Sequence, residues 1–338
     1  MMPQQLLNFV LFIQLPCAVF VYINAKRRGM DNFWLWVVGT ALFMPLFLPF
    51  YVLLRPRETY FYCPNCKMRN FFPAESCRHC DLEISRMDNV SVRGEWKLSD
   101  AIAIFALSVF TFPISLTGLS VVLGLMERDS KSWGSMFFLS FIGAALIVGL
   151  PLWFILKVCG RPLSDAGLAR DRLYKNIALG AAMLIPILFV EYAAEEIVVR
   201  TSVLIAPSHA EAIRNLQEEE HRQGAELLPQ SSNEIMKLIG AAIILIILSP
   251  IGEEVLFRGI AYTALKRRQD KWRAMIITSV FFAILHMQLI HFFPIVLSGF
   301  ILVYLFELTG SLVPSITLHF AYNLALMVFW YIHPSLYT

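Results

Sequence analysis

The sequence predicts an all-α polytopic membrane protein with about eight to nine transmembrane helices. Hydrophobic residues fill 57% of its 338 positions and charged residues only 16%, whereas soluble domains carry about 25% charged residues. The apolar residues fall in separate runs, and about 20 helical residues are enough to cross a hydrocarbon core. The net charge of +3 is small, and the basic residues lie beside these runs rather than in one patch. Nucleic acid is therefore not expected as a partner.

Residues 1–54 contain two apolar runs, at 5–25 and 33–54. Basic residues follow the first run directly, and no small-residue cleavage site is clear after it. We therefore interpret this run as a membrane anchor rather than a signal peptide. The second run contains Pro45 and Pro49, which predict a kinked or re-entrant segment.

A polar segment, residues 55–98, follows these runs and carries two CxxC pairs ten residues apart. Each pair can give two thiolates to one tetrahedral zinc ion, and a segment this small needs the metal in order to fold. Two disulfides or a redox-active CxxC are the alternatives, and His79 is a less favoured ligand. We predict a small zinc-ribbon-like module with a structural zinc bound by Cys63, Cys66, Cys77 and Cys80.

The remaining sequence alternates between apolar runs and charged loops. Residues 99–194 are expected to form membrane helices, at about 99–125, 134–157 and 176–194. Residues 195–234 hold eight glutamates and are interpreted as a solvated, acidic extramembrane loop. Residues 235–338 form a second membrane region, with runs at about 235–257, 274–290, 292–308 and 312–333.

Lysine and arginine in short loops predict the orientation, because they favour the cytoplasmic side of a membrane. Loops 158–175 and 265–273 are rich in both residues and should be cytoplasmic. The acidic loop then lies outside, and the cysteine module lies in the cytoplasm, where thiols stay reduced and available to zinc. The basic residues after the first apolar run conflict with this count unless the second run is re-entrant.

Three ionisable residues, Glu253, Glu254 and Arg258, end the apolar run that begins at residue 235. A charge at membrane depth costs about 2.5–3.5 kcal/mol on insertion scales, so each of them needs a partner or a function. Glu254 and Arg258 have the spacing of an intrahelical ion pair, with the acid N-terminal. Glu253 lies about 100° away around the helix and must find its partner on another helix.

Two later apolar segments carry His286, His319 and Asn323, and the last two share a helix face. Each residue taken alone is more typical of a hydrogen bond between packed helices than of a functional group. Polar residues near the ends of the runs are interpreted as interfacial or structural, namely Glu191, His291, Glu307 and His333.

Taken together, Glu253, His286, His319 and Asn323 favour catalysis, because they come from three helices and can converge on one water molecule. A buried glutamate of weakened acidity can act as a general base, while histidine and amide donors face a developing oxyanion. The same Glu, His, His set can alternatively bind a metal with an open position for water. The HExxH and GxGD motifs are absent from the sequence, as is any convincing serine–histidine arrangement.

The order and spacing of four motifs resemble the CPBP (ABI) intramembrane endopeptidases, which include the type II CAAX prenyl proteases. The motifs fall within roughly residues 235–330 and are Glu253-Glu254-x-x-x-Arg258, Phe282-x-x-x-His286, Thr309-Gly310-Ser311-Leu312 and His319-x-x-x-Asn323. The resemblance implies a helical membrane core with a water-accessible cavity. It also implies a metal-independent glutamate mechanism, favoured over a zinc-metalloprotease one, so no catalytic cofactor is expected.

By the same resemblance, Glu253 activates the water with His286, and His319 and Asn323 stabilise the oxyanion. The substrates implied are peptides or proteins, lipidated or membrane-associated ones included, in contact with membrane lipid.

The resemblance also implies that Glu254 and Arg258 order the site.

An alternative function is that of a non-hydrolytic membrane scaffold or immunity-type binding protein. In that case the polar residues only join helices, and the zinc module recruits a partner.

Overall fold

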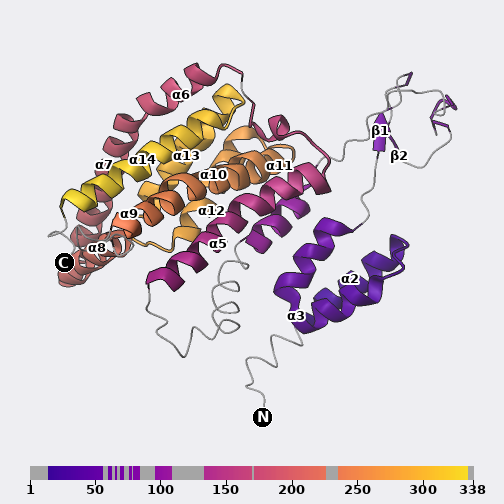
Figure 1. The fold of residues 1–338 in the computed structure, drawn as a ribbon, viewed down its shortest axis with the longest axis horizontal. Helices are drawn as coiled ribbons and strands as arrows, with labels where there is room; N and C mark the ends of the chain where they lie inside the picture. Colours follow the sequence, from indigo (N-terminus) through magenta and orange to yellow (C-terminus); the bar gives the residue numbers. More distant parts are fainter. Residues whose placement is uncertain are drawn as a thin grey trace, which may run out of the picture. The chain divides into compact units, whose positions relative to one another are not determined.

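The computed structural model shows a helical protein with one small pair of strands (Figure 1). It divides into two compact units, Met1–Phe110 with Trp153–Pro162, and Thr111–Leu152 with Leu163–Thr338. The residues that the structure describes are 14–55, 60–62, 65–66, 69–71, 76–77, 79–83, 96–108, 133–169, 171–225 and 235–333.

In the first unit, helices α2 (Leu15–Arg27) and α3 (Phe33–Leu54) pack around a small buried cluster that includes Val21 and Tyr51. The Tyr51 hydroxyl donates a hydrogen bond of 2.7 Å to Asn24 Oδ1, which joins the two helices. This unit also contains a short apolar helix and a π-helical turn, Leu98–Ser108 and η3 (Phe154–Val158).

Helix α3 is kinked at Phe43, where φ is −145° and ψ is 70°. The kink lies two residues before Pro45, whose ring does not fit against the preceding helical turn and whose nitrogen has no proton to donate. The kink predicted from the two prolines is therefore confirmed.

The cysteine segment contains two short antiparallel pairings. Strand β1 (Tyr60–Tyr62) pairs with β2 (Arg69–Phe71), and an isolated bridge joins Ser76 to Glu83. Turns at 65–66 and 79–80 fall within the two CxxC pairs. Cys66 and Cys80, one cysteine of each CxxC pair, therefore lie in turns.

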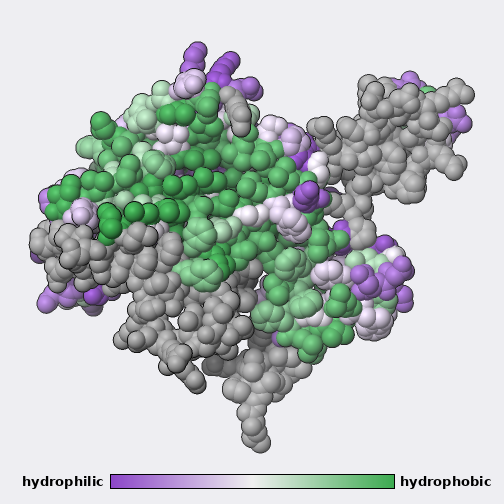
Figure 2. Space-filling view, viewed as in Figure 1, coloured by the Kyte–Doolittle hydropathy of each residue, from purple (hydrophilic) through white to green (hydrophobic). Residues whose placement is uncertain are grey.

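Six helices among the described residues are long and apolar enough to cross a membrane, and they confirm an all-α polytopic membrane protein. Figure 2 shows a broad hydrophobic surface over the helices, with hydrophilic residues gathered near their ends. The six candidate spans are Phe33–Leu54, Ser140–Val158, Leu173–Ile205, Leu238–Lys266, Phe292–Thr309 and Val313–Ile332.

The described residues thus hold fewer spans than the sequence predicts, for two reasons. The runs 5–25 and 99–125 lie partly outside the described residues. The run 274–290 falls on α12 (Lys271–His286), and its 16 residues are short of a full crossing.

Helices α6 (Leu173–Ala182) and α7 (Leu184–Ile205) follow each other directly and form one candidate span of 33 residues. A short turn, η5 (Pro207–His209), then leads into α8 (Ala210–Ala225). The region expected to be a solvated loop is therefore mostly helical up to residue 225. Its charged residues are also not all solvated, because Glu220 on α8 is only 5% exposed.

One long span, Leu238–Lys266, carries the charged motif. Two π-helical stretches interrupt it, on either side of the short α-helix that holds Glu253 and Glu254. π-Helical turns are rare in proteins overall, and those that do occur often lie at functional sites. The segments are α9 (Ile235–Ala242), η6 (Ile243–Leu248), α10 (Ser249–Glu254), η7 (Val255–Tyr262) and α11 (Thr263–Lys266).

Helices α13 (Phe292–Thr309) and α14 (Val313–Ile332) complete the second unit. Gly310 has a φ of 66° and ends α13 in the left-handed conformation that glycine adopts without strain. A core cluster joins α7, α13 and α14, and consists of Ile187, Leu302, Leu305 and Leu318. The remaining elements are α5 (Trp133–Trp153) and a 3-10 turn, η4 (Leu163–Ala166).

Gly180 lies at a close approach of α6 to α14. A Cβ atom there would lie 2.4 Å from the Pro314 carbonyl oxygen and 2.8 Å from Thr317 Cβ. Gly180→Ala should therefore push the helices apart and lower the free energy of unfolding by about 1–3 kcal/mol, as overpacking does. Equilibrium unfolding in detergent micelles measures this loss.

Gly149→Ala is the matched control, because a Cβ atom at this exposed position of α5 would meet nothing within 4 Å. That change should stabilise the protein slightly, by up to about 1 kcal/mol, since alanine favours a helix over glycine. A loss of equal size in both variants would contradict the packing of α6 on α14 described above.

Candidate functional site

The Glu254–Arg258 ion pair predicted from the sequence is present and buried. Arg258 Nη1 lies 2.9 Å from Glu254 Oε1, and the two side chains are 2% and 0% exposed. Arg258 Nη2 also donates a hydrogen bond of 3.2 Å to the Gly299 carbonyl, and the guanidinium lies 4.6 Å from the centre of the Phe282 ring. These added partners matter because burial removes water from both charges.

His319 joins this pair to Glu253. Its Nδ1 lies 3.0 Å from Glu254 Oε1, and its Nε2 lies 3.9 Å from Glu253 Oε2. A carboxylate only accepts hydrogen bonds, so Nδ1 carries a proton, and Nε2 is the ring atom that faces Glu253. The partner that Glu253 was predicted to need from another helix is therefore His319 on α14.

His286 and Asn323 each make one hydrogen bond to a backbone carbonyl. His286, the last residue of α12, has Nδ1 at 2.8 Å from the Phe282 carbonyl, which leaves Nε2 for a second contact. Asn323 Nδ2 donates a hydrogen bond of 2.8 Å to the Leu245 carbonyl in η6. An amide nitrogen has two protons, so one of them remains to be donated.

The Leu245 carbonyl takes this bond because of Pro250. In η6, the Ser249 N–H bonds to the Ile244 carbonyl, five residues earlier. The same pattern one residue later would join the nitrogen of Pro250 to the Leu245 carbonyl, and proline has no N–H. Asn323 supplies the missing donor and ties α14 to the helix that carries Glu253.

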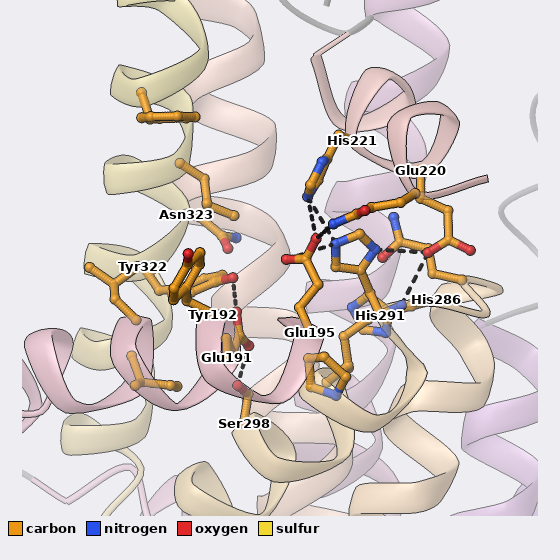
Figure 3. Close-up of a pocket in the computed structure, with 18 of the residues that line it drawn as sticks. Glu191, Tyr192, Glu195, Glu220, His221, His286, His291, Ser298, Tyr322 and Asn323 are labelled. Atoms are coloured by element: carbon orange, nitrogen blue, oxygen red, sulfur yellow. Dashed lines mark hydrogen bonds and ion pairs between the residues drawn. The ribbon is translucent and has the colours of Figure 1, made fainter. Parts of the chain in front are cut away.

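A cavity of about 730 Å³ brings three of the four predicted catalytic residues together, because His286, His319 and Asn323 line it. Figure 3 shows this cavity, with His286 and Asn323 labelled. Glu253 is not one of the lining residues, and its side chain is 25% exposed. It meets the lining of the cavity through His319. Much of the remaining wall is apolar and includes Ile187, Leu188, Leu302, Leu326, Phe329 and Trp330.

The cavity also holds a second polar cluster, which was not predicted from the sequence. Glu191, interpreted from the sequence as interfacial or structural, accepts hydrogen bonds from Ser298 and Tyr322. Glu191 and Glu195 are four residues apart at the end of an apolar run, and this spacing could have indicated a polar face on α7. The members of the cluster are Glu191, Glu195, Glu220, His221 and His291.

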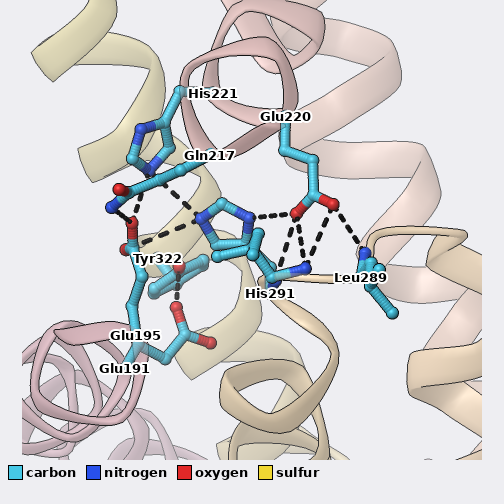
Figure 4. Close-up of polar contacts among 9 residues, drawn as sticks. Glu191, Glu195, Gln217, Glu220, His221, Leu289, His291 and Tyr322 are labelled. Atoms are coloured by element: carbon cyan, nitrogen blue, oxygen red, sulfur yellow. Dashed lines mark hydrogen bonds and ion pairs between the residues drawn. The ribbon is translucent and has the colours of Figure 1, made fainter. Parts of the chain in front are cut away.

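Glu220 ties α8 to the chain that enters α13 (Figure 4). Its carboxylate accepts hydrogen bonds from the backbone amides of Leu289, Ile290 and His291, at 2.6 to 3.1 Å. Burial raises the pKa of Glu220, but the hydrogen bonds from the His291 ring and from these amides outweigh it and hold the pKa below its usual value. A residue expected in a solvated loop is thus an ionised cap at the start of a membrane helix.

Three of the four predicted zinc ligands cluster in the cysteine segment. The ligand atoms of Cys66, Cys77 and Cys80 all lie within 4.8 Å of one another, so they can hold a metal ion. Cys66 Sγ and Cys77 Sγ are 3.6 Å apart, much farther than the roughly 2.05 Å of a disulfide. Cys63 lies outside the described residues, and the exposed His79 is not part of the cluster.

The fold and this site define an integral membrane protein with a buried carboxylate–histidine centre among its helices. Residues 235–325, which contain Glu253, His286, His319 and Asn323, match the family model described as Type II CAAX prenyl endopeptidase Rce1-like. The match confirms the resemblance seen in the sequence and supports a protease of the CAAX type. Comparisons with curated proteins and with solved structures found no match.

The buried ion pair predicts a large loss of stability when one partner is removed. Arg258→Ala leaves Glu254 charged in a site without water, and should lower the free energy of unfolding by about 3–5 kcal/mol. Equilibrium unfolding in detergent, followed by tryptophan fluorescence, measures the change.

Arg200→Ala is the matched control, because Arg200 forms the same i,i+4 pair with Glu196 but is 81% exposed. An exposed helical pair contributes about 0.3–0.5 kcal/mol, so this variant should unfold almost as the parent does. Similar losses in the two variants would show that burial does not set the strength of the Glu254–Arg258 pair.

Proposed function

We propose that this protein is an intramembrane endopeptidase that hydrolyses a peptide bond with a water molecule activated by Glu253. One observation carries the proposal. A carboxylate oxygen of Glu253 and Nε2 of His319 face each other across 3.9 Å. When the His319 ring is neutral, both atoms accept, so a water molecule beside them can donate one hydrogen bond to each. That water would be polarised toward hydroxide.

In this mechanism Glu253 is the general base that takes a proton from the attacking water. Glu254 and Arg258 act on the reaction through His319, because the bond from Nδ1 to Glu254 fixes the ring and its tautomer. The resemblance assigns the activation of water to His286 together with Glu253. The contact between His319 and Glu253 favours His319 as the histidine closest to that step.

The oxyanion then needs donors from the cavity wall. Asn323 has a second amide proton to donate, since only one is used by the Leu245 carbonyl. His286, in its protonated form, can donate from Nε2 while Nδ1 stays bonded to Phe282. Such fixed donors stabilise the charge that develops on the carbonyl oxygen. Glu253 returns its proton to the leaving amine and completes the hydrolysis.

A catalytic metal bound by Glu253, His286 and His319 is the less favoured mechanism. Among the described residues, the groups with three ligand atoms close enough for one ion are the cysteine cluster and Glu195 with His221 and His291. The geometry at Glu253 therefore favours direct activation of water by the carboxylate.

We further propose peptide or protein substrates that are lipidated or membrane-associated. The apolar part of the wall, contributed by α7, α13 and α14, suits a hydrocarbon chain or hydrophobic side chains. Polar residues at one side suit the peptide backbone. The family matched by residues 235–325 acts on prenylated substrates, according to its description, which supports the same substrate class.

Glu253→Gln tests the general base. The amide keeps the size of the side chain but cannot take up a proton, so cleavage of a peptide library in lipid vesicles should fall by about 10²–10⁴-fold. Glu211→Gln, which changes an exposed glutamate of α8, should cleave as the parent does.

Equal cleavage by Glu253→Gln and the parent would rule out the proposed role. A cellular phenotype that survives Glu253→Ala combined with His286→Ala would instead favour the scaffold or immunity-type function. Both outcomes are read against an unchanged content of folded protein in the membrane.

We also propose that Cys63, Cys66, Cys77 and Cys80 bind one structural zinc in a cytoplasmic module. The support is the convergence of the three described thiols. Replacing Cys66 and Cys77 by serine should remove one equivalent of zinc, measured by mass spectrometry of the purified full chain. Cys17→Ser, a change in α2, should leave the zinc content as it is. An undiminished content in the double variant would contradict this site.

A further inference from the structure

Glu195, His221 and His291 bring three metal-ligating atoms together at one side of the cavity (Figure 4). His221 Nε2 lies 3.1 Å from Glu195 Oε1 and 3.1 Å from His291 Nε2. The third distance, from His291 Nε2 to Glu195 Oε2, is 3.5 Å. In a tetrahedral zinc site with bonds of about 2.0–2.2 Å, neighbouring ligand atoms lie about 3.3–3.6 Å apart. Each of the three distances is close to the length of such an edge, although the two histidines contact different oxygens of the Glu195 carboxylate, and one ligand atom from each residue lies within 4.8 Å of the other two.

Further residues orient two of these ligands. His291 Nδ1 lies 2.7 Å from Glu220 Oε2, and Gln217 Nε2 donates a hydrogen bond of 2.6 Å to Glu195 Oε1. Because the Glu220 carboxylate accepts, Nδ1 carries a proton, and Nε2 is the ring nitrogen that faces the cluster. A histidine that donates its other ring proton to a carboxylate is the usual arrangement at protein metal sites.

The balance of charge also favours a cation in this cluster. Glu195 and Glu220 place two carboxylates against the rings of His221 and His291. The side chains of Glu220, Glu195 and His291 are 5%, 15% and 16% exposed, so little water screens the carboxylates. Nearby positive charge stabilises carboxylates that are mostly removed from water, and one divalent ion would add to the hydrogen bonds that both carboxylates already accept.

We propose that Glu195, His221 and His291 bind a zinc ion, with Glu220 and Gln217 holding the ligands in place. One ligand comes from α7, one from α8, and one from the residue before α13. The ion would therefore fasten α8 to two membrane helices that line the cavity. Three protein ligands leave a fourth position, open toward the cavity, for water or a carbonyl oxygen.

This site is distinct from the Glu253 centre and from the cysteine module, and metal binding there does not depend on hydrolysis. Without a metal, protons on the imidazole nitrogens hold the cluster together through the hydrogen bonds described above. Zinc would take the place of a proton at the centre, because its histidine ligands bind through unprotonated nitrogen.

The experiment uses the full chain in detergent, with Cys66 and Cys77 replaced by serine to remove metal from the cysteine module. This parent should retain one equivalent of zinc. Adding His221→Ala and His291→Ala should abolish it, whereas His209→Ala, at an exposed histidine before α8, should keep it. Cobalt bound to the parent should give ligand-field bands without thiolate charge-transfer bands.

Glu220→Gln is a milder variant that keeps all three ligands. It should weaken zinc binding by about 10–100-fold, as the loss of a partner that orients a ligand does. Equal zinc content with and without His221 and His291 would overturn the proposal. If that variant does not fold, unchanged affinity in both Glu220→Gln and Glu195→Gln would overturn it as well.

Discussion

The buried centre formed by Glu254, Arg258 and His319 depends on the contacts of the Glu254 carboxylate. This carboxylate is 0% exposed and holds Arg258 on its own helix and His319 on α14, while Arg258 also bonds to Gly299 on α13. An ionised carboxylate without these partners would be very costly in an apolar setting. Three helices must therefore pack correctly before the charges are compensated. Glu254 holds the His319 ring through Nδ1, and this contact sets which ring nitrogen faces Glu253.

The sequence predicted well what depends on local spacing. The pairing of Glu254 with Arg258 follows from one helical turn, and the kink in α3 follows from its prolines. The residues His286, His319 and Asn323 could be singled out because apolar helices rarely carry such groups. Their assembly at one cavity was an expectation about packing, and the structure shows it for these three but not for Glu253.

The part of the polar cluster on α8 could not be predicted, because the Glu220 carboxylate is compensated by distant backbone. A run of glutamates normally indicates solvation, and no local pattern shows that Glu220 meets three amides near residue 290. Glu195 likewise depends on Gln217 and His221, which α8 brings back to the cavity. Composition describes the average environment of a segment, whereas burial here is decided residue by residue.

The bond between Asn323 and the Leu245 carbonyl has a consequence for reading related sequences. Pro250 removes a backbone donor, and the asparagine replaces it from another helix. Substitutions at positions 250 and 323 should thus be accepted or rejected as a pair. A descendant that had lost its chemistry would still retain the asparagine for as long as it kept the proline. The backbone alone therefore explains why Asn323 would be retained, and its presence is no evidence of catalysis.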